Sequence, residues 1–256
     1  MKHPPCILCI GGHDPTGGAG LQADIETVTV LGGQAMSLVT ALTAQDTHNV
    51  ASLLPTPADF FTAAAERLLR DITPDAIKIG LIGSVALIPP LVQILRGFPG
   101  PVVLDPVLAA GGGFDLSAVR LVEVMREQLL PLATLTTPNR AEARRLADND
   151  DAAEAAQSLL HWGADAVLLT GADEATGDVV TNQLYLGDGN PRAFRWPRLP
   201  HRYHGSGCTL ASACAAYLAL GDDVITAVNR AQGFTAGALQ AANQPGGGQW
   251  LPWRRG

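Results

Sequence analysis

The sequence has few charged residues, few aromatic residues and no long apolar run. Charged residues make up 16% of its 256 residues, the formal net charge is −7, and lysine and arginine never cluster beyond adjacent arginine pairs. Proteins that bind nucleic acids usually carry a basic patch, so this composition argues against a nucleic acid as partner. The longest apolar run, CAAYLAL, is far shorter than a membrane span, and no secretory signal is evident. We therefore expect a cytoplasmic protein that binds neither membranes nor nucleic acid.

Four cysteines are too few for a disulfide scaffold in a chain of this length. Cys6 and Cys9 form a C-x-x-C pair inside CILCI, which reads as a buried strand. Residues three apart on a strand face opposite sides, and the sequence has no second pair to complete a zinc site. We expect both cysteines to be core thiols.

Short β-branched runs alternate with longer amphipathic runs. The predicted strands are CILCIGG, MSLVTALTA, DAIKIGLIG, PVVLDPV, ATLTTPN and DAVLLTG. The predicted helices cover residues 20–31, 58–69, 117–130, 152–162, 207–220 and 224–242. Most of the strands are almost continuously apolar, as in a parallel sheet covered on both faces, while NQLYLGDGNPRAFRWPRL predicts an antiparallel hairpin at the sheet edge. The sequence thus predicts a three-layer α/β domain over residues 1–256, with an irregular tail from about residue 244.

Ligands of such sheets bind beyond the carboxyl ends of the strands, so the polar residues there are candidates for a site. The first strand is followed by GGHDPTGGAGLQAD, whose glycines favour a binding loop over a merely flexible one, although it lacks the spacing of a dinucleotide fingerprint or a P-loop. Asp24 lies near the start of the next helix, where it either interacts with the helix dipole or points into the site. Gln45, after a later strand, offers both a donor and an acceptor to a heterocycle.

Three further polar residues follow predicted strands. Asp105 precedes a proline in VVLDPV, and Asn139 and Glu142 lie three residues apart in TTPNRAEA. An amide and a carboxylate at this spacing could hold a hydrated Mg²⁺ near phosphates. They equally fit a helix cap in which Asn139 caps and Glu142 reaches back. The sequence leaves both interpretations open.

The segment HGSGCTLASA, residues 204–213, opens a predicted helix with a glycine-rich turn. Backbone amides converge at such a helix start, which suits a transferring phosphoryl group. Cys208 then lies where its thiol could meet an acceptor hydroxyl, and the helix N-terminus is expected to lower the pKa of that thiol. The alternative is a small buried residue that fills the turn.

The segments DPTGGAGLQAD, TALTAQDT, IKIGLIG, VVLDPV, TPNRAEA and HGSGCTLASA, in this order, resemble the ribokinase-like superfamily. Within it they resemble the hydroxymethylpyrimidine/phosphomethylpyrimidine kinases of thiamine biosynthesis, from about Ile7 to about Ala242. The resemblance implies a three-layer α/β/α sandwich without a separate lid domain, and a homodimer. It implies phosphorylation by MgATP of 4-amino-5-hydroxymethyl-2-methylpyrimidine, its monophosphate, or both. Whether a monovalent cation takes part stays open.

The resemblance also implies roles for individual residues. On the acceptor side it places Gly12, Asp24, Gln45 and the backbone around Val107 against the pyrimidine. Asn139 and Glu142 match the element near Mg²⁺ and the phosphates, with the metal held through water. The residues implied for the nucleotide and phosphate region also include Asp105, Thr170 and His204. The anion hole comprises Gly205, Ser206, Gly207 and Cys208, with Cys208 as the base.

Two departures from the family pattern affect the phosphate region. Thr170 stands where the family usually has a lysine, and glycines 111–113 stand near where a second basic residue is common. Loss of these cations predicts slower phosphoryl transfer, or compensation by His13, Arg140 or His204. Two alternatives therefore remain: a pyridoxal kinase of the same branch, and a weakly active paralogue that binds a pyrimidine.

The terminal segment QPGGGQWLPWRRG has no predicted role. Its two tryptophans could pack on the domain or on a partner. Its glycines indicate a mobile approach to whichever surface they contact.

Overall fold

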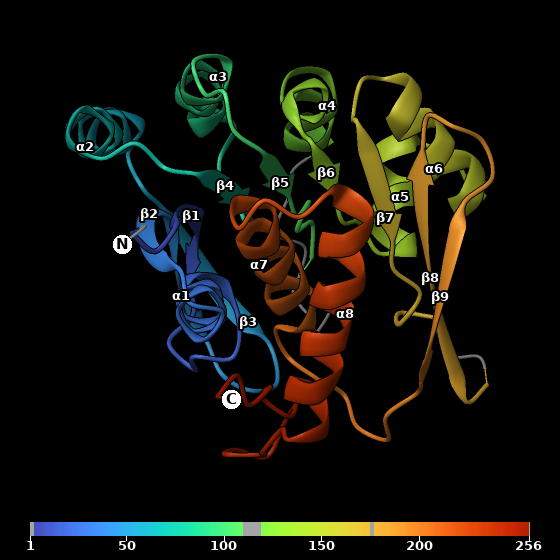
Figure 1. Cartoon of the computed structure of the whole chain (residues 1–256). Helices are drawn as coiled ribbons and strands as arrows, with labels where there is room; N and C mark the ends of the chain where they lie inside the picture. The colour runs from blue at the N-terminus through green and yellow to red at the C-terminus, as the bar shows by residue number, and fades with distance from the viewer. Residues whose placement is uncertain (1–2, 110–118, 175–176, 256) are drawn as a thin grey trace.

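The strands of the computed structural model, which describes residues 3–109, 119–174 and 177–255, form one sheet. Its strand order is β3-β2-β1-β4-β5-β6-β7-β8-β9 (Figure 1). The strands are β1 (Cys6–His13), β2 (Gln34–Gln45), β3 (Val50–Pro55), β4 (Ala76–Ile79), β5 (Val102–Leu104), β6 (Leu135–Thr136), β7 (Ala166–Leu169), β8 (Val179–Leu186) and β9 (Arg192–Pro197). Neighbours from β2 to β7 pair in parallel, while β3, β8 and β9 pair antiparallel at the two edges.

Helices cover both faces of the sheet, which gives the predicted three layers. One face carries α1 (Gly20–Val30), α7 (Ser206–Ala219) and α8 (Val224–Gln240). The opposite face carries α2 (Ala58–Asp71), α3 (Ile88–Arg96), α4 (Val119–Gln128), α5 (Arg140–Ala147) and α6 (Ala152–His161). Short 3₁₀ turns occupy Val85–Leu87 and Leu130–Leu132.

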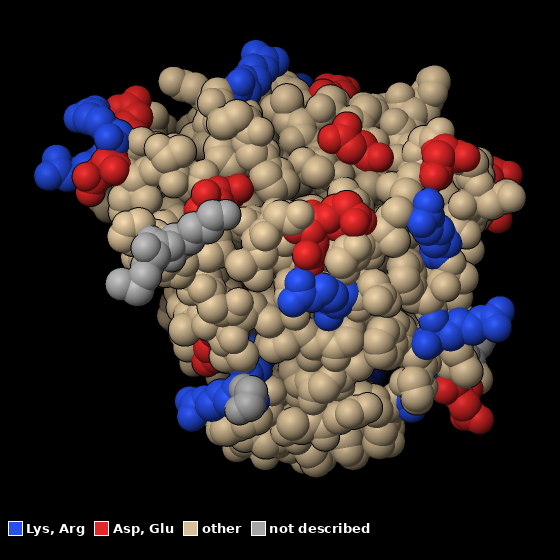
Figure 2. Space-filling model, viewed as in Figure 1, with Lys and Arg blue, Asp and Glu red and all other residues tan. Residues whose placement is uncertain are grey.

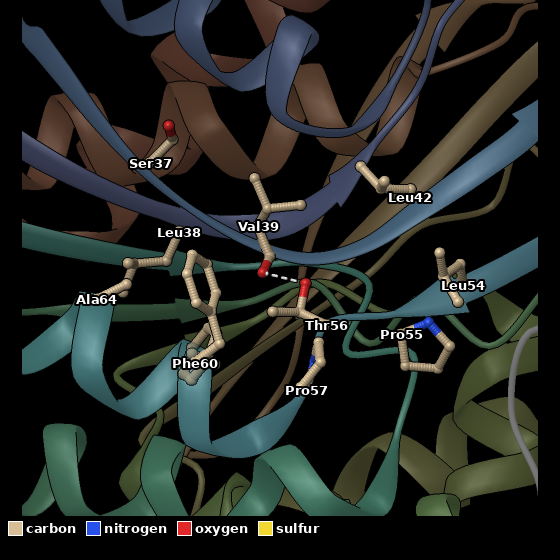
Figure 3. Close-up of a pocket in the computed structure, with 11 residues that line it drawn as sticks. Ser37, Leu38, Val39, Leu42, Leu54, Pro55, Thr56, Pro57, Phe60 and Ala64 are labelled. Atoms are coloured by element: carbon tan, nitrogen blue, oxygen red, sulfur yellow. Dashed lines mark hydrogen bonds between the residues drawn. The ribbon is translucent and has the colours of Figure 1, made fainter.

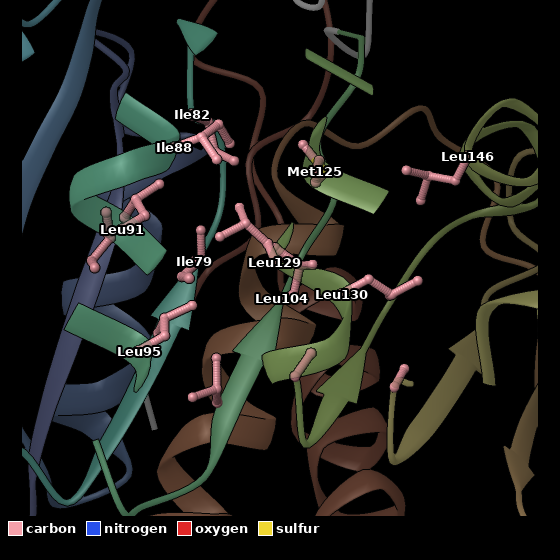
Figure 4. Packing of buried hydrophobic residues seen from close by; sticks show 14 of the residues in the cluster. Ile79, Ile82, Ile88, Leu91, Leu95, Leu104, Met125, Leu129, Leu130 and Leu146 are labelled. Carbon is pink, nitrogen blue, oxygen red and sulfur yellow. The ribbon is translucent and has the colours of Figure 1, made fainter. Parts of the chain in front are cut away.

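The apolar runs of the central strands supply a core on each side of the sheet. In β1, Leu8 and Ile10 belong to the core under α2–α6, whereas Ile7 and Cys9 belong to the core under α1, α7 and α8. Figure 4 shows part of the first core, where side chains of the central strands meet those of α3 and α4. Burial on both faces is why these strands lack polar alternation.

The prediction that Cys6 and Cys9 are core thiols on opposite faces is confirmed. Cys9 is fully buried, and burial raises the pKa of its thiol far above the ordinary value. Cys6 is half-buried and packs against the other core. Both are free thiols.

The predicted hairpin is also confirmed, as β8 and β9. The sequence analysis did not single out β3 or α3. In α3, Pro89 and Pro90 lie in the first turn, where a helix needs no backbone N–H donors. The start of the predicted helix 117–130 and glycines 111–113 lie outside the described residues.

No helix in the described ranges is long and apolar enough to cross a bilayer. On the face drawn in Figure 2, acidic and basic side chains are interspersed among neutral ones rather than gathered by sign.

The strand order reverses at β1, which pairs with β2 on one side and β4 on the other. A crevice forms beyond the carboxyl ends of strands at such a reversal, and ligands of open α/β sheets bind there. The loops that follow β1, β2 and β5 are therefore the place to look for a site.

Candidate active site

The glycine-rich loop after β1 meets the start of α7. Gly205, the N-cap of α7, has a φ of 87°, and its α-carbon lies directly against the carbonyl of Gly18. Any side chain at position 205 would overlap that carbonyl, and the left-handed conformation would strain it further. The glycines of HGSG are thus required for this close approach.

The first turn of α7 presents its amides at this junction. The helix begins at Ser206, and no side chain of a described residue caps it. Amides at a free helix N-terminus, together with the helix dipole, favour an anion. Asp105 faces the same turn, because its Oδ1 lies 4.0 Å from the position that a Cβ on Gly207 would take. The residues predicted to form the anion hole therefore lie beside a buried carboxylate.

A buried ion cluster lies beneath this turn. Lys78 in β4 is 1% exposed, and its Nζ lies 2.8 Å from Asp24 Oδ1 and 3.9 Å from Asp105 Oδ2. Ser212 Oγ donates a hydrogen bond of 2.6 Å to the same Asp24 oxygen. Burial alone would lower the pKa of Lys78, but the negative charges of Asp24 and Asp105 outweigh it and raise that pKa. Lys78 is therefore a permanent cation that links α1, β4 and the end of β5.

Asp105 is the acid of this cluster that lies nearest to the first turn of α7. Burial raises the pKa of Asp105 to about 6, against the opposing effects of Lys78 and of a hydrogen bond from Cys208. Its Oδ2 has no hydrogen-bond partner among the described residues. At neutral pH it is largely an ionised carboxylate that can accept a further proton.

The expectation of a lowered pKa for Cys208 is wrong. Burial, together with the charges of Asp105 and Asp24, raises the pKa of its thiol to about 12, although Lys78 and the Gly20 amide act in the opposite direction. Two nearby carboxylates and the loss of water outweigh the helix dipole. Cys208 is thus a thiol beside Asp105 and not a resting thiolate.

The Asn139–Glu142 pair forms the helix cap that the sequence left as one of two interpretations. Asn139 Oδ1 accepts a hydrogen bond of 2.8 Å from the Glu142 amide, and Glu142 Oε2 accepts one of 2.9 Å from the Asn139 amide. Burial and the charge of Asp105 raise the pKa of Glu142 to about 8. The Leu108 amide also bonds this carboxyl group, which ties the loop after β5 to the start of α5.

Comparison with known proteins shows the family to which this chain belongs. The sequence pattern of the phosphomethylpyrimidine kinase family matches residues 14–252. The chain belongs to this family. It is 38% identical over 252 residues to the hydroxymethylpyrimidine/phosphomethylpyrimidine kinase of Streptomyces coelicolor, covering 96% of this chain and 92% of that one. It is 40% identical to the thiamine biosynthesis bifunctional protein ThiED of Geobacter sulfurreducens, covering 94% of this chain and half of that protein.

A solved structure shows the same fold. The pyridoxal kinase of Staphylococcus aureus, in complex with AMP-PCP and pyridoxal, superposes with a TM-score of 0.91 at 29% identity. The match covers 99% of this chain and 94% of that one. The chain is accordingly a ribokinase-like phosphotransferase that uses ATP.

The structure gathers most of the residues expected to face the acceptor around the ends of β1 and β2. Gly12 is buried near the end of β1. Gln45, half-buried at the end of β2, donates through Nε2 to Thr43 Oγ1 at 2.8 Å, and Thr43 in turn bonds the His13 carbonyl. Val107 is half-buried beyond β5. Contact of these family positions with a substrate stays a prediction.

Asp24 differs from the other acceptor-side residues in being fully buried. One carboxylate oxygen bonds Lys78 and Ser212, and the other lies 3.7 Å from the Cβ position of Gly11 without a hydrogen-bond partner among the described residues. In this structure Asp24 supports the site from within the core. Direct contact with a pyrimidine stays a prediction.

Thr170 and Arg140, which are both expected near the phosphates, lie close to each other. Thr170, after β7, pairs with Asn139, and its amide donates to the Pro138 carbonyl at 2.9 Å. Arg140 Nε lies 3.4 Å from Glu174 and 3.3 Å from the Cβ position of Gly171. A cation therefore stands beside the position where the family usually has a lysine.

The two histidines proposed as substitute cations are placed differently. His13 is exposed at the end of β1. His204 is buried, and its Nε2 lies 2.8 Å from Asp14 Oδ2. Burial alone would raise the pKa of Asp14, but hydrogen bonds from His204 and Thr16 outweigh it and lower that pKa. A phosphate contact by His204 stays a prediction, and it would require this pair to separate.

Sequence reasoning missed Lys78 and Asp14 as residues of the site. A lysine inside the apolar run IKIGLIG was a usable signal, because a buried lysine needs a partner. Asp14 gave no comparable signal, because its partner His204 is 190 residues away.

Proposed function

We propose that this enzyme phosphorylates the hydroxymethyl group of 4-amino-5-hydroxymethyl-2-methylpyrimidine, its monophosphate, or both, within thiamine biosynthesis. The observation that carries the proposal is the pairing of Cys208 with Asp105 at the free N-terminus of α7. That turn offers amides to a phosphoryl group and a hydrogen-bonded thiol to an alcohol. The names of the sequence relatives support the pyrimidine as acceptor.

The raised pKa values suggest how the acceptor alcohol is activated. The alcohol gives its proton to Cys208 Sγ while the thiol proton passes to Asp105. The alcohol oxygen then forms a bond to the γ-phosphorus of ATP, the bond from that phosphorus to the bridging oxygen breaks, and ADP leaves. The amides of Ser206, Gly207 and Cys208 stabilise the charge on the transferring group.

Asn139 and Glu142 fit a hydrated Mg²⁺. Among the described residues no group of three or more His, Cys, Asp and Glu side chains could enclose a metal, but Mg²⁺ with nucleotides commonly uses few protein ligands and several waters. Glu142 is a carboxyl whose pKa rises to about 8 beside Asp105, so a divalent cation nearby would favour its charged form. Bound Mg²⁺ would neutralise phosphate charge there. A monovalent cation stays a prediction.

Measuring ADP release in the presence of MgATP tests the acceptor. We expect kcat/KM for the aminopyrimidine alcohol or its monophosphate to exceed that for pyridoxal by at least about tenfold, since correctly placed hydrogen bonds to a heterocycle are worth this much. The controls omit the acceptor or chelate the metal with EDTA. A preference for pyridoxal would contradict the proposal. ADP release no faster than without acceptor, combined with tight pyrimidine binding by calorimetry, would favour the weakly active paralogue.

Pyridoxal phosphorylation is the second candidate. The specific observation in its favour is the close structural similarity to a pyridoxal kinase over almost the whole chain. The higher sequence identity to pyrimidine kinases places it second.

We also propose a homodimer in which a second copy covers an apolar groove. The groove lies between β2, β3 and the start of α2 and has a volume of about 420 Å³ (Figure 3). Its rim exposes Val39 (37%), Leu42 (49%), Leu54 (65%) and Phe60 (68%). Monomeric proteins rarely expose such contiguous apolar surface. In addition, β3 is an edge strand, whose outer backbone N–H and C=O groups have no partner strand. The family resemblance supports the same assembly.

A charge in this groove is expected to dissociate the dimer. Leu54→Asp should reduce the mass in sedimentation equilibrium from that of two chains to that of one, because an unpaired carboxylate would be buried at the interface. Val119→Asp is the matched control, since Val119 is also exposed (73%) but lies on α4, outside the groove. A wild-type protein with the mass of one chain would refute the dimer.

A cytoplasmic location is also proposed. All four cysteines lie in the described part of the chain and are free thiols, which suits a reducing compartment.

A further inference from the structure

The C-terminal tail, whose role the sequence left open, is bonded to three loops of the candidate site. Its Gln249 amide donates to the Thr47 carbonyl at 2.7 Å, next to the end of β2. Its Trp250 carbonyl accepts a bond of 2.9 Å from the His204 amide, in the loop before α7. The glycines 246–248 pack against Thr47 and His48. In Figure 1 the tail, in red, ends beside α1.

Arg254, near the end of this tail, is 3% exposed and binds three elements at once. Its Nε donates to Thr209 Oγ1 in α7 at 2.8 Å, and one terminal nitrogen lies 3.2 Å from Glu26 Oε2 in α1. The terminal nitrogens also donate to the carbonyls of Gly17, at 3.4 Å, and Gly18. A planar guanidinium presents five N–H donors in a rigid fork, whereas the three donors of a lysine ammonium radiate from a single nitrogen and cannot span the same set of acceptors.

These bonds reach both sides of the junction that forms the anion site. The Gly18 carbonyl that accepts from Arg254 is the one against which the Gly205 α-carbon lies. Thr209, which accepts from Arg254 Nε, donates through the same hydroxyl to the Gly205 carbonyl at 2.8 Å. Arg254 therefore holds the glycine loop and the first turn of α7 against each other.

The same loop also contacts the thiol. The Gly20 amide, two residues beyond Gly18, faces Cys208 and lowers the pKa of its thiol against the effect of burial. A shift of the loop would move this amide relative to the thiol and to the amides of Ser206 and Gly207. Displacement by about 1 Å at a reacting centre can cost about 10²-fold in rate.

We propose that Arg254 is a positioning residue for phosphoryl transfer. It acts by fixing the glycine loop to the first turn of α7, and it contacts neither the acceptor nor ATP. This inference rests on the proposed role of that turn as the anion site.

Full-length Arg254→Ala and Arg254→Lys test the inference, with Arg255→Ala as control. Arg255 neighbours Arg254 on the tail but is exposed and packs on Trp253. We expect kcat to fall by about 10²-fold in Arg254→Ala and about tenfold in Arg254→Lys, with little change in the KM for ATP, because geometry and not binding is lost. The control should stay within about twofold. Free guanidinium should restore part of the activity of Arg254→Ala but none of that of Cys208→Ala.

Hydrogen exchange gives a readout that does not depend on the acceptor. Amides of residues 17–20 and 205–209 should exchange faster in Arg254→Lys than in Arg255→Ala. If Arg254→Ala does not fold, kcat and hydrogen exchange of Arg254→Lys are compared with those of Arg255→Ala instead. Equal kcat and equal exchange in Arg254→Lys and Arg255→Ala would overturn the inference. A wild-type chain that releases no ADP with any acceptor would instead contradict the proposed function, and the exchange comparison would still test Arg254.

Discussion

Cys208→Ala is expected to lower kcat by about 10² to 10⁴-fold, the usual contribution of a group that moves a proton in the transition state. Binding of ATP should change little, because the amides of the first turn of α7 are backbone groups that survive the substitution. Cys214→Ala is the matched control, since Cys214 is a fully buried thiol that packs in the core on the same helix. Steady-state ADP release and calorimetry with a nucleotide measure the two effects. An unchanged kcat would remove Cys208 from the mechanism.

The pH dependence of kcat/KM distinguishes a Cys208 thiol that passes its proton to Asp105 from a resting thiolate base. Asp105 accepts a proton only when ionised, and its pKa is about 6, so kcat/KM of the wild type should fall as pH drops through about 6. A thiolate base with the pKa of about 12 of Cys208 would instead give activity that keeps rising tenfold per pH unit through the neutral range. A profile that still rises in this way above pH 7 would contradict transfer to Asp105.

Lys78→Met is expected to lower the free energy of unfolding by about 3–5 kcal/mol at pH 7, because it leaves buried carboxylates without their cation. Asp24 and Asp105 are both buried, and Lys78 Nζ lies 2.8 and 3.9 Å from them. Methionine fills much of the same volume, so the loss reports charge and not a cavity. Urea unfolding followed by circular dichroism measures the change. A loss below about 1 kcal/mol would show that the cluster contributes little to stability.

Two controls test this prediction. One is the double variant that combines Asp24→Asn with Lys78→Met, and the other is the pH dependence of the free energy of unfolding. Asp24→Asn removes one of the carboxylates that Lys78→Met leaves without a cation, so it should recover part of the lost free energy of unfolding. The folded-state pKa of Asp105 already lies above its unfolded value and should rise further without Lys78. An acid with a raised folded pKa loses stability as pH rises through its unfolded pKa, so acidification should favour the folded variant. The difference between wild type and Lys78→Met should therefore shrink as pH falls from 8 to below about 6.

The apolar runs predicted the central sheet because a strand covered on both faces needs apolar residues at almost every position, and this pattern is visible in the sequence. The six predicted strands and the edge hairpin all occur. The edge strand β3 was not singled out, since a strand of this kind is fixed by pairing with β2 more than by its own composition. The two prolines of α3 likewise argued against a helix, although they lie in its first turn, where a helix tolerates proline.

The sequence placed the candidate site at the strand ends and at HGSG, which stays a prediction, but it did not anticipate the electrostatics there. The helix dipole alone predicted an acidic Cys208. Burial of the thiol, together with the carboxylates of Asp105 and Asp24 that approach it only in the folded chain, reverses that expectation. The sequence also left the tail without a role, because its partner residues Gly18 and Thr209 are far away along the chain.

The sequence by itself determined the layer architecture, the glycine-rich junction and the family, since each depends on local residue patterns and spacing. Only the tertiary structure decided which groups are charged and which are held in place. It brings Lys78, Asp24 and Asp105 from three separate elements to one buried point, and it returns Arg254 to the loop of Gly17 and Gly18. Burial and the distances between charges set pKa values and positions, and both quantities exist only once the chain has folded.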